Sequence, residues 1–485
     1  MRRAPGLMPR MRKAVFRHRL WVLGSLTGLA ACHFAPPHAT PPLPTPPLYD
    51  ASLTPLGTAG ARAADIGWRD FFLDPRLESL IAAAIEYNRD LVVAVGRIDV
   101  AKGLYRIQGA DRIPTVVGTA GVTRTHSGGG ASGFPGGQEF TLDRGSITAS
   151  VPSFEIDFWG RVRDLTDAAK ADYLATVQAQ RAFRLSLIQD VAAAYFAQLE
   201  TLEQIRLADT TVLSRREVLR IAQVRQRAGL TSALDLRSAE SLLAQAEASR
   251  AALGVIQAQV NSLLLVLVGG PVQGPLPAPL PLALQTDTTL LGPGLPSELL
   301  LARPDILAAE ERLRGAEASI GAARAAFFPN ISLTGAFGFA SAALNSLVGL
   351  DGLTWNAGPS IATPIFNRGR LKGNAQVARA QGRIALAEYK RSIQSAFREV
   401  TDALAGRRYL AEQVAAQDRA AIAQRSIAQL ARTRYVEGVA NYLEVLDAER
   451  NLFQTEQQLL RLRRTNSENL VALYIALGGG VIERR

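Results

Sequence analysis

The sequence predicts an α+β membrane protein built from two tandem structural repeats, each with two transmembrane β-strands and long antiparallel helices. Three observations lead to this prediction. Two long stretches contain no proline, four short stretches alternate apolar and polar residues, and the two halves resemble each other at a fixed distance of 209 residues. A chain of 485 residues is long enough for two or three domains or for one very elongated one.

The first 31 residues have the composition of a secretory signal peptide. Seven basic residues and no acidic ones precede Trp21, and the apolar run "LWVLGSLTGLAA" (20–31) is too short to cross a bilayer as a helix. The same basic residues account for most of the formal charge of +11, because the remaining chain has 47 basic and 43 acidic residues. We therefore expect no nucleic-acid partner.

Cys32 follows this run directly and is the only cysteine in the chain. The stretch "LAAC" (29–32) resembles the lipobox of bacterial lipoproteins, in which the cysteine is lipidated and becomes the first mature residue. Because residue 33 is His rather than Asp, the resemblance implies sorting to the outer membrane. The alternative is a signal peptide that contains a cysteine by chance. With Cys32 as a lipid anchor, no disulfide can form.

The mature chain lacks most of the residue types that catalytic and metal sites need. Methionine occurs only in the leader, and the three histidines that remain are His33, His38 and His126. The mature chain therefore has too few cysteines and histidines for a zinc cluster, a Cys–His pair or a Ser–His triad. Paired carboxylates could still catalyse, but no recognisable pocket encloses them. We expect no enzyme, no metal site and no cofactor beyond the covalent lipid on Cys32.

Two proline-rich stretches divide the chain into segments. Residues 32–64 contain the proline-dense stretch "FAPPHATPPLPTPPL" (34–48), which predicts an extended tether between the lipid anchor and the folded body. The first repeat then covers 65–270. A second proline-rich stretch, "PVQGPLPAPLPLA" (271–283), opens the linker 271–296, and the second repeat covers 297–485.

Two segments without proline, 153–270 and 365–485, predict long helices. In the first, apolar residues recur in steps of three and four: Ile188, Val191, Tyr195, Leu199, Leu202 and Ile205. We predict long helices over about 160–228 and 369–437, each roughly 100 Å long at about 1.5 Å per residue. Shorter helices follow to about 268 and 477, and another precedes the second strand pair over about 303–328. Such lengths are typical of coiled-coil rods.

Four stretches of about ten residues alternate with period two, as transmembrane strands do. They form two pairs, about 114–158 and 330–366. The apolar positions are Val116, Ala120 and Val122; Ile147, Ala149 and Val151; Ile331, Leu333, Phe337 and Phe339; and Leu353, Trp355, Ala357 and Ile361. We expect the aromatic residues to face lipid and the threonines on the opposite faces to line a water-filled pore. A soluble sandwich is the alternative interpretation.

Four strands cannot close a barrel, and open strand edges are not tolerated in lipid. If the strands cross a membrane, several chains must therefore pool them. This argument predicts an oligomer without giving the number of chains.

The repeat is clearest over about 110 residues that align without a gap at an offset of 209. The matched pairs include Gly160-Arg161 with Gly369-Arg370, Gly229 with Gly438, Leu234 with Leu443, and Ala239-Glu240 with Ala448-Glu449. Before the strands the offset is 215, with Pro114 matching Pro329. Each copy reads helix, strand, loop, strand, long helix, glycine break, helix.

These motifs resemble the outer-membrane factor (TolC-type) family, in particular its multidrug-efflux lipoprotein (NodT/OprM-like) branch. The stretches that carry the resemblance are "PSFEIDFWGR" (152–161), "RPDILAAEERL" (303–313), "ARAAFFPNISLTG" (323–335), "TPIFNRGRL" (363–371) and "YVEGVANYLEVLDAER" (435–450). The resemblance implies a homotrimer with a 12-stranded β-barrel in the outer membrane above a periplasmic tunnel of helices. It also implies two partners, a periplasmic adaptor protein and an inner-membrane transporter, most simply of the RND type.

The two glycine breaks predict the tips of helical hairpins. Gly229 and Gly438 suit turns that need a positive φ. "SALD" (232–235) and "NYLE" (441–444) each fit a capping box, which is the structural explanation for Asp235 and Glu444. Capping does not explain Asp447, one turn further on.

The family resemblance assigns further roles at these tips. Glu444 and Asp447 match the acidic rings of the periplasmic aperture, where carboxylates from three chains would repel one another and attract cations. Asp235 and Tyr435 match two positions of the latch that holds paired hairpins together. The basic residue expected at 440 is Ala440, so the latch here must differ, with Arg432 or Arg434 as candidates.

The function implied is a passive exit duct of a tripartite efflux pump for drugs or other small solutes. A type I protein-secretion duct uses the same fold, and a copper- or silver-efflux duct is a further alternative, although the missing methionines argue against soft-metal ligands. A different class, a lipid-anchored structural rod or adhesin, would have no use for paired alternating strands.

Overall fold

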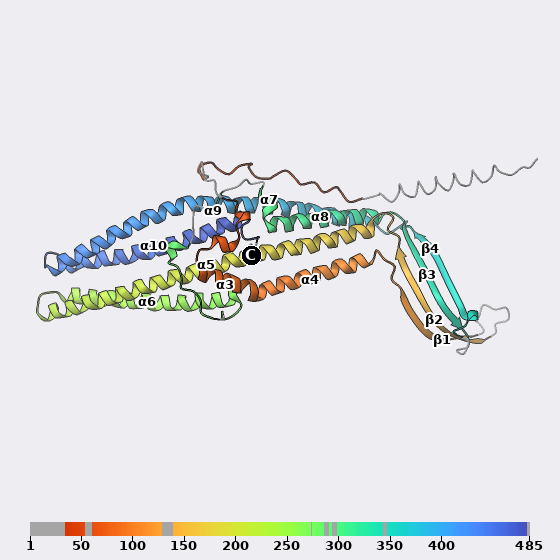
Figure 1. Ribbon diagram of the computed structural model, residues 1–485, viewed down its shortest axis with the longest axis horizontal. Coiled ribbons are helices and arrows are strands. Elements are labelled where there is room, and N and C mark those ends of the chain that lie inside the picture. The colour runs from red at the N-terminus through yellow and green to blue at the C-terminus, as the bar shows by residue number, and fades with distance from the viewer. Residues whose placement is uncertain are drawn as a thin grey trace, which may run out of the picture. The chain divides into compact units, whose positions relative to one another are not determined.

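The computed structural model describes residues 34–53, 61–128, 139–272, 274–285, 291–292, 298–342 and 347–482 (Figure 1). The predicted signal peptide and Cys32 lie outside these residues. The chain divides into two compact units: residues 1–40, 99–175 and 310–388 form the first, and residues 41–98, 176–309 and 389–485 form the second. Each unit thus takes residues from both sequence repeats, so a repeat is not a compact unit by itself.

The first unit contains one antiparallel sheet of four strands in the order β1-β2-β3-β4. The strands are β1 (Val117–Ser127), β2 (Phe140–Glu155), β3 (Asn330–Ser341) and β4 (Leu353–Ala362). Strands β2 and β3 come from different repeats and pair along most of their length, with a register shift between Val151 and Phe154. The two predicted strand pairs therefore join into one sheet, and β1 and β4 are its edges.

The strand register separates the two faces of the sheet. Phe337 of β3 lies opposite Trp355 of β4 and Ala149 of β2, and both aromatic side chains are mostly exposed. On the other face Thr119 lies opposite Thr148, and their Oγ1 atoms are 2.8 Å apart. The aromatic and threonine faces expected from the alternation are therefore separate in the structure.

Strand β2 begins at Phe140, seven residues before Ile147, the first alternating apolar position expected in it. Its first residues include Asp143, and Asp143 pairs with Arg124 of β1 in a two-pronged ion pair, with Arg124 Nε 2.6 Å from Asp143 Oδ1. These charged residues interrupt the apolar alternation, but they stabilise the same ladder as a cross-strand pair.

Two long helices in each repeat follow the strands and form a hairpin. Helices α5 (Arg161–Arg227) and α9 (Arg370–Val436) have 67 residues each and lie 209 residues apart, with ends within one residue of those predicted. Helices α6 (Ala233–Val268) and α10 (Tyr442–Ala476) run back from them. In the second unit α6 packs along α5 through ion pairs such as Arg250–Asp209, and α10 along α9 through Arg425–Glu456 (Figure 1).

Shorter helices precede the strands. They are α2 (Trp68–Phe71), α3 (Pro75–Tyr87), α4 (Arg89–Ala110), α7 (Leu299–Ala302) and α8 (Pro304–Ala325). Helices α2, α3 and α7 lie in the second unit, whereas α4 and α8 each divide between the two units. The ring of Phe71 stacks on that of Tyr474 with centroids 4.0 Å apart, and both side chains are fully buried. Asp74 caps α3 and is also fully buried, where it accepts hydrogen bonds from Arg76 N, Tyr195 Oη, Leu280 N and Gln285 Nε2.

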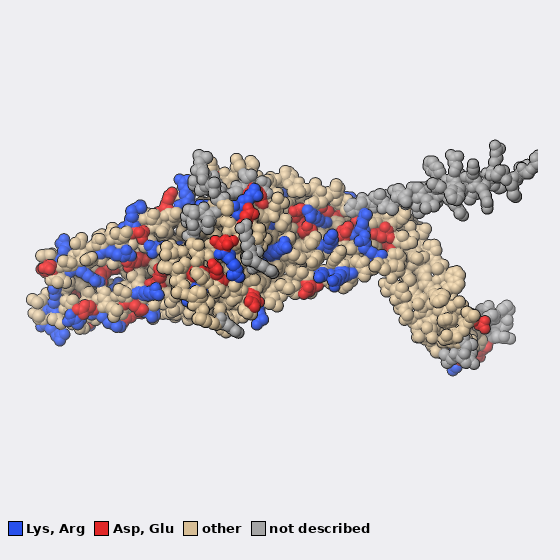
Figure 2. All heavy atoms as spheres, viewed as in Figure 1, with Lys and Arg blue, Asp and Glu red and all other residues tan. Residues whose placement is uncertain are grey.

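Charge is distributed unevenly between helices and strands. On the face shown in Figure 2, basic and acidic side chains are spread over the helices, whereas the surface of the strands is almost uncharged apart from its far end. Within the described strands the charged residues are few: Arg124, Asp143, Arg144 and Glu155. An uncharged strand surface fits a sheet that meets lipid.

Candidate functional site: the paired helix tips

The two hairpin turns have the same backbone geometry. Gly229 has φ +71° and Gly438 has φ +77°, as expected for a left-handed C-terminal turn. In each turn the residue after the glycine donates its N–H to a carbonyl of the preceding helix, from Leu230 to Arg225 and from Val439 to Arg434. No atom lies within 4 Å of a Cβ built at either glycine, so φ alone creates the preference for glycine.

The first tip restarts with a complete capping box. Ser232 Oγ accepts the N–H of Asp235 at 3.2 Å, and Asp235 Oδ2 accepts the N–H of Ser232 at 3.3 Å. The hydroxyl of Thr231 donates to the same Oδ2 at 2.5 Å. This hydroxyl is the main reason why the pKa of Asp235 is lowered. All three contacts of Asp235 lie within its own turn.

The second tip forms only half of the capping box that the sequence predicts. Asn441 Oδ1 accepts the N–H of Glu444 at 3.1 Å, but the Glu444 carboxylate lies instead 3.4 Å from Nε of Arg434. The repeat explains the difference, because Thr231 corresponds to Ala440, which has no hydroxyl. Glutamate is also one methylene longer than Asp235, so its carboxylate reaches back to the preceding helix.

The two predicted aperture residues are close in the structure and accessible. Glu444 lies in the first turn of α10 and Asp447 in the next, and their side chains are 44% and 54% exposed. Each has a basic neighbour, since Arg450 Nη2 lies 3.0 Å from Asp447 Oδ1. The tip therefore carries two carboxylates that are partly neutralised within the chain.

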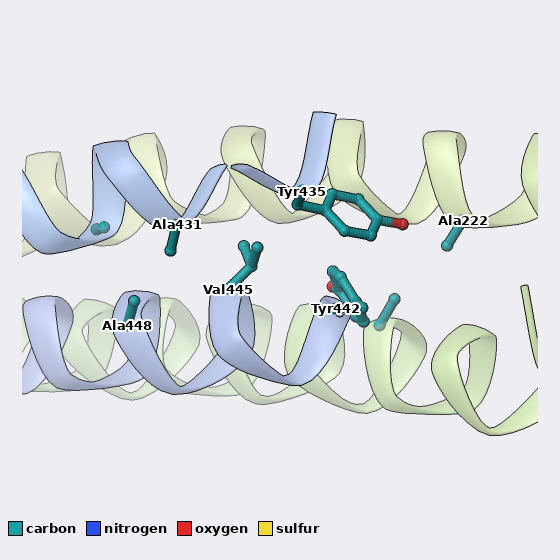
Figure 3. Packing of buried hydrophobic residues seen from close by; sticks show 8 residues of the cluster. Ala222, Ala431, Tyr435, Tyr442, Val445 and Ala448 are labelled. Atoms are coloured by element: carbon teal, nitrogen blue, oxygen red, sulfur yellow. The ribbon is translucent and has the colours of Figure 1, made fainter. Parts of the chain in front are cut away.

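An apolar cluster joins the two hairpins just behind the tips (Figure 3). It consists of Ala222, Ala239, Ala428, Ala431, Tyr435, Tyr442, Val445 and Ala448. The rings of Tyr435 and Tyr442 lie 5.4 Å apart, and the guanidinium of Arg225 lies 4.4 Å from the Tyr435 ring. Burial raises the pKa of Tyr442. Alanine at most of these positions lets the helices approach closely.

The predicted latch pair is not hydrogen-bonded in this structure. Within the described residues, Asp235 is bonded in its own turn, whereas Tyr435 contacts Arg225 and Tyr442. Their role as a latch stays a prediction.

A polar link between the hairpins lies further from the tips. Arg432 of α9 donates from Nε to Glu449 Oε1 of α10 at 2.6 Å, and its Nη2 donates to Ser214 Oγ of α5. Glu449 is buried, and the buried Arg215 donates from Nη1 to the carbonyl of Leu242 on α6 at 2.7 Å. Desolvation lowers the pKa of Arg215, while the charge of Glu449 opposes this shift. All four helices therefore meet at this link.

Sequence reasoning named Arg432 as a latch candidate but missed Glu449 and Ser214. The repeat does not identify Glu449, because its counterpart Glu240 pairs with Arg237 on its own helix. Burial of Glu449 depends on how the hairpins pack, and no pattern within one helix reports that.

Other features of the described residues do not suggest a catalytic or metal site. They contain no group of three or more His, Cys, Asp and Glu side chains that could hold a metal ion. A cavity of about 540 Å³ in the second unit borders Arg303, whose guanidinium is bonded to Asp305, Glu399 and the carbonyl of Ala476. These contacts fasten α8, α9 and α10 together, which is a structural role.

Comparisons with known proteins agree with this geometry. A family model described as "Outer membrane efflux protein" matches residues 80–269 and 295–479. The chain is 41% identical over 414 residues to the solvent efflux pump outer membrane protein SrpC of Pseudomonas putida, covering 85% of this chain and 87% of SrpC. It is 37% identical over 453 residues to the cation efflux system protein CusC of Escherichia coli (strain K12), covering 93% and 97%.

Solved structures show the same fold. The open state of the MtrE outer membrane channel of Neisseria gonorrhoeae superposes with a TM-score of 0.84 at 36% identity, covering 93% of this chain and 99% of that one. A crystal structure of CusC gives a TM-score of 0.81 at 35% identity, covering 93% and 100%. Since the family model spans both repeats and the relatives align over most of their length, the chain belongs to the outer membrane efflux protein family.

Proposed function

We propose that this outer-membrane efflux protein works as a homotrimeric duct, in which three four-stranded sheets close a 12-stranded barrel above a periplasmic tunnel of helices. The observation that carries the proposal is the sheet itself. It has an exposed aromatic face and two edge strands, β1 and β4, whose outer sides pair with no strand among the described residues. In lipid such edges must be paired, and copies of the same sheet supply matching strands.

The apolar surface of α6 supports association of chains. By length and composition alone, α6 is the one described helix that could cross a membrane. Its ion pairs with α5, however, make it part of a hairpin whose other helix is strongly polar. Several large apolar residues near its C-terminal end are exposed in the single chain: Val255, Ile256, Leu263, Leu265 and Val266. We assign this surface to contacts between subunits, since single soluble chains rarely leave such a patch uncovered.

The hairpin tips form the periplasmic mouth in this proposal. Three chains would bring six carboxylates, from Glu444 and Asp447, around one axis and give the resting aperture a preference for cations. Exposed apolar side chains at both tips (Leu230, Leu234, Val436, Val439 and Leu443) suit the docking of a periplasmic adaptor protein. Transport is passive, with energy supplied by an inner-membrane transporter, most simply of the RND type.

The cargo we propose is drugs or other small organic solutes, since SrpC is named as part of a solvent efflux pump. CusC is named as a cation efflux protein, so metal efflux is the second candidate. The mature chain offers no methionine and no thiol other than that of Cys32, which we propose to be lipidated, so soft metal ions would find no soft ligands in the duct. A protein-secretion duct with the same architecture remains the other alternative.

The test is the ion conductance of the purified protein in planar bilayers, with the wild type compared with the double variant Glu444→Ala and Asp447→Ala. We expect a small, cation-selective conductance in the wild type and a larger, less selective one in the variant. Absence of conductance from both, in trimers shown to be folded, would overturn the duct. If the wild type and the double variant had equal conductance and equal selectivity, the protein would still be a duct, but Glu444 and Asp447 would not line its aperture.

A further inference from the structure

The proline-rich segment after Cys32 does not run free of the protein but lies against α8 in the first unit. At its start, the ring of Phe34 stacks on Phe328 with centroids 4.8 Å apart, and Phe328 in turn stacks on Trp159 at 4.7 Å. The carbonyl of Phe34 accepts a hydrogen bond from Arg324 Nη1 at 2.8 Å. Two different contacts, one apolar and one polar, thus hold the first described residue.

The second residue of the segment, Ala35, lies against Gly321 of α8, where a larger side chain would collide with it. A Cβ built at Gly321 would lie 2.7 Å from the backbone nitrogen of Ala35 and 2.2 Å from a carboxylate oxygen of Asp164. The missing side chain at Gly321 therefore makes room for the segment. This close approach shows that α8 is shaped to receive the segment.

His38 completes the contact between two carboxylates that lie on one face of α8, two helical turns apart. Its Nδ1 lies 2.8 Å from Glu317 Oε2, and its Nε2 lies 3.3 Å from Glu310 Oε1. Glu310 also accepts from Arg314 Nη2 at 2.6 Å. The side chains of His38, Glu310 and Glu317 are 25%, 16% and 18% exposed, so water can reach the imidazole while it lies between the two carboxylates.

The chemistry of imidazole makes this arrangement sensitive to protonation. A neutral ring has one N–H and one lone pair, so only one of the two carboxylates could receive a hydrogen bond. The imidazolium form donates from both nitrogens and adds a positive charge between two negative ones. Both ring nitrogens face carboxylate oxygens here, which is the geometry that the charged form prefers.

We propose that the surface running from Glu310 on α8 to Phe328, just past the end of that helix, is a docking site for the chain's own segment 34–38, and that protonation of His38 controls whether this segment is seated. The segment seats when the imidazole carries a proton and loosens as the pH rises and the proton is lost. The other charged groups that face the segment are Arg314 and Arg324 of α8 and Asp164 of α5.

Seating also limits the reach of the lipid anchor. Cys32 precedes Phe34 by two residues, and two residues span at most about 7 Å. Phe328, on which Phe34 stacks, precedes the first residue of β3 by two residues. A seated segment therefore keeps the acyl chains of a lipidated Cys32 close to the start of the strands, whereas release adds the five residues 34–38 to the chain between lipid and protein.

The experiment replaces Phe34 by the photo-crosslinking analogue p-benzoylphenylalanine in the full-length, membrane-reconstituted protein. The yield of crosslinks to the peptide that contains Phe328 measures seating at pH 5.5 and pH 8.5. We expect a high yield at the lower pH and a clear drop at the higher one. With His38→Gln or with Glu310→Gln and Glu317→Gln together, the yield should be low at both pH values, because two charge-assisted contacts are worth about tenfold or more in such an equilibrium.

Two further variants serve as controls. Glu311→Gln changes a neighbouring carboxylate that pairs with Arg314 but does not touch His38, so its yields should follow the wild type. His38→Arg carries a permanent charge and should keep the yield high at both pH values. If the yield is the same in every variant and at both pH values, the Phe34 stack and Arg324 hold the segment without His38, and the proposal is wrong. His38→Gln leaves α8 unaltered, so a misfolded helix cannot explain its result.

Discussion

Arg434 in the last turn of α9 lies with its Nε 3.4 Å from Glu444 Oε1 in the first turn of α10, across the second hairpin tip. One arginine therefore offsets part of the negative charge of the proposed aperture from within the same chain. The strength of the cation preference should depend on this arginine as much as on the carboxylates.

Replacing Arg434 by Ala should increase the cation selectivity of the channel, by about threefold, because each subunit then exposes one more unbalanced carboxylate at the mouth. The measurement is the reversal potential in a salt gradient. Arg434→Ala combined with Glu444→Ala should return the selectivity toward the wild type. An unchanged reversal potential in the single variant would place Glu444 away from the ion path.

The link made by Arg432 predicts that losing Ser214 and losing Arg432 itself have different costs. Ser214→Ala removes one contact without burying a charge, and we expect a stability loss of about 1 kcal/mol together with a larger conductance. Arg432→Ala leaves the buried Glu449 without its partner and should cost about 3 kcal/mol or more. Denaturant titration and bilayer recordings check both expectations. If Ser214→Ala left conductance and stability unchanged, this link would not hold the hairpins together.

The two faces of the sheet predict opposite tolerance to charge. Phe337→Arg on the aromatic face should cost about 2–4 kcal/mol in the membrane and prevent insertion of trimers. Thr148→Arg on the threonine face should insert normally and change conductance instead. Heat-stable trimers on gels measure insertion and assembly, and bilayer recordings measure the conductance of the pore. The reverse pattern would mean that the assignment of lipid and lumen faces must be exchanged.

Acid should weaken the second unit through Asp74. Although burial alone would raise the pKa of this carboxyl, hydrogen bonds from Gln285, Tyr195, Leu280 and Arg76 lower it below its ordinary value. The carboxylate therefore stabilises the folded state fully above the ordinary pKa of about 4, and this stabilisation is lost as the pH falls through the lowered value. Asp74→Asn should lower the thermal midpoint at pH 7 by removing an acceptor that four donors share, at a cost of about 2–3 kcal/mol. It should also flatten the dependence of that midpoint on pH below about 4, and a slope as steep as that of the wild type would assign the acid effect to other groups.

Much of the fold could be predicted because its signals are local. Gly160-Arg161 and Gly369-Arg370 precede the long helices, and Gly229 and Gly438 follow them, so the ends of α5 and α9 are close to those expected. Where a polar side chain bonds is less predictable. "SALD" and "NYLE" look alike, yet only Asp235 completes its box, because Thr231 is replaced by Ala440 in the second copy.

Contacts between distant segments could not be predicted from the sequence. The burial of Glu449 depends on packing of α5 against α10, and the position of His38 depends on α8, about 270 residues away. Periodicity describes one helix or strand at a time, so it carries no information about such partners. The early start of β2 has a related cause, since Asp143 is stabilised there by a residue of another strand.

The unpaired edges of β1 and β4 have a genetic consequence. If three chains must each supply strands to one closed barrel, a single subunit with a defective strand edge prevents closure of any trimer that contains it. Expressed in equal amount with the wild type, it would leave only about one assembly in eight entirely intact. A defect in one strand edge should therefore behave as a dominant trait, whereas loss of the whole gene copy should be recessive.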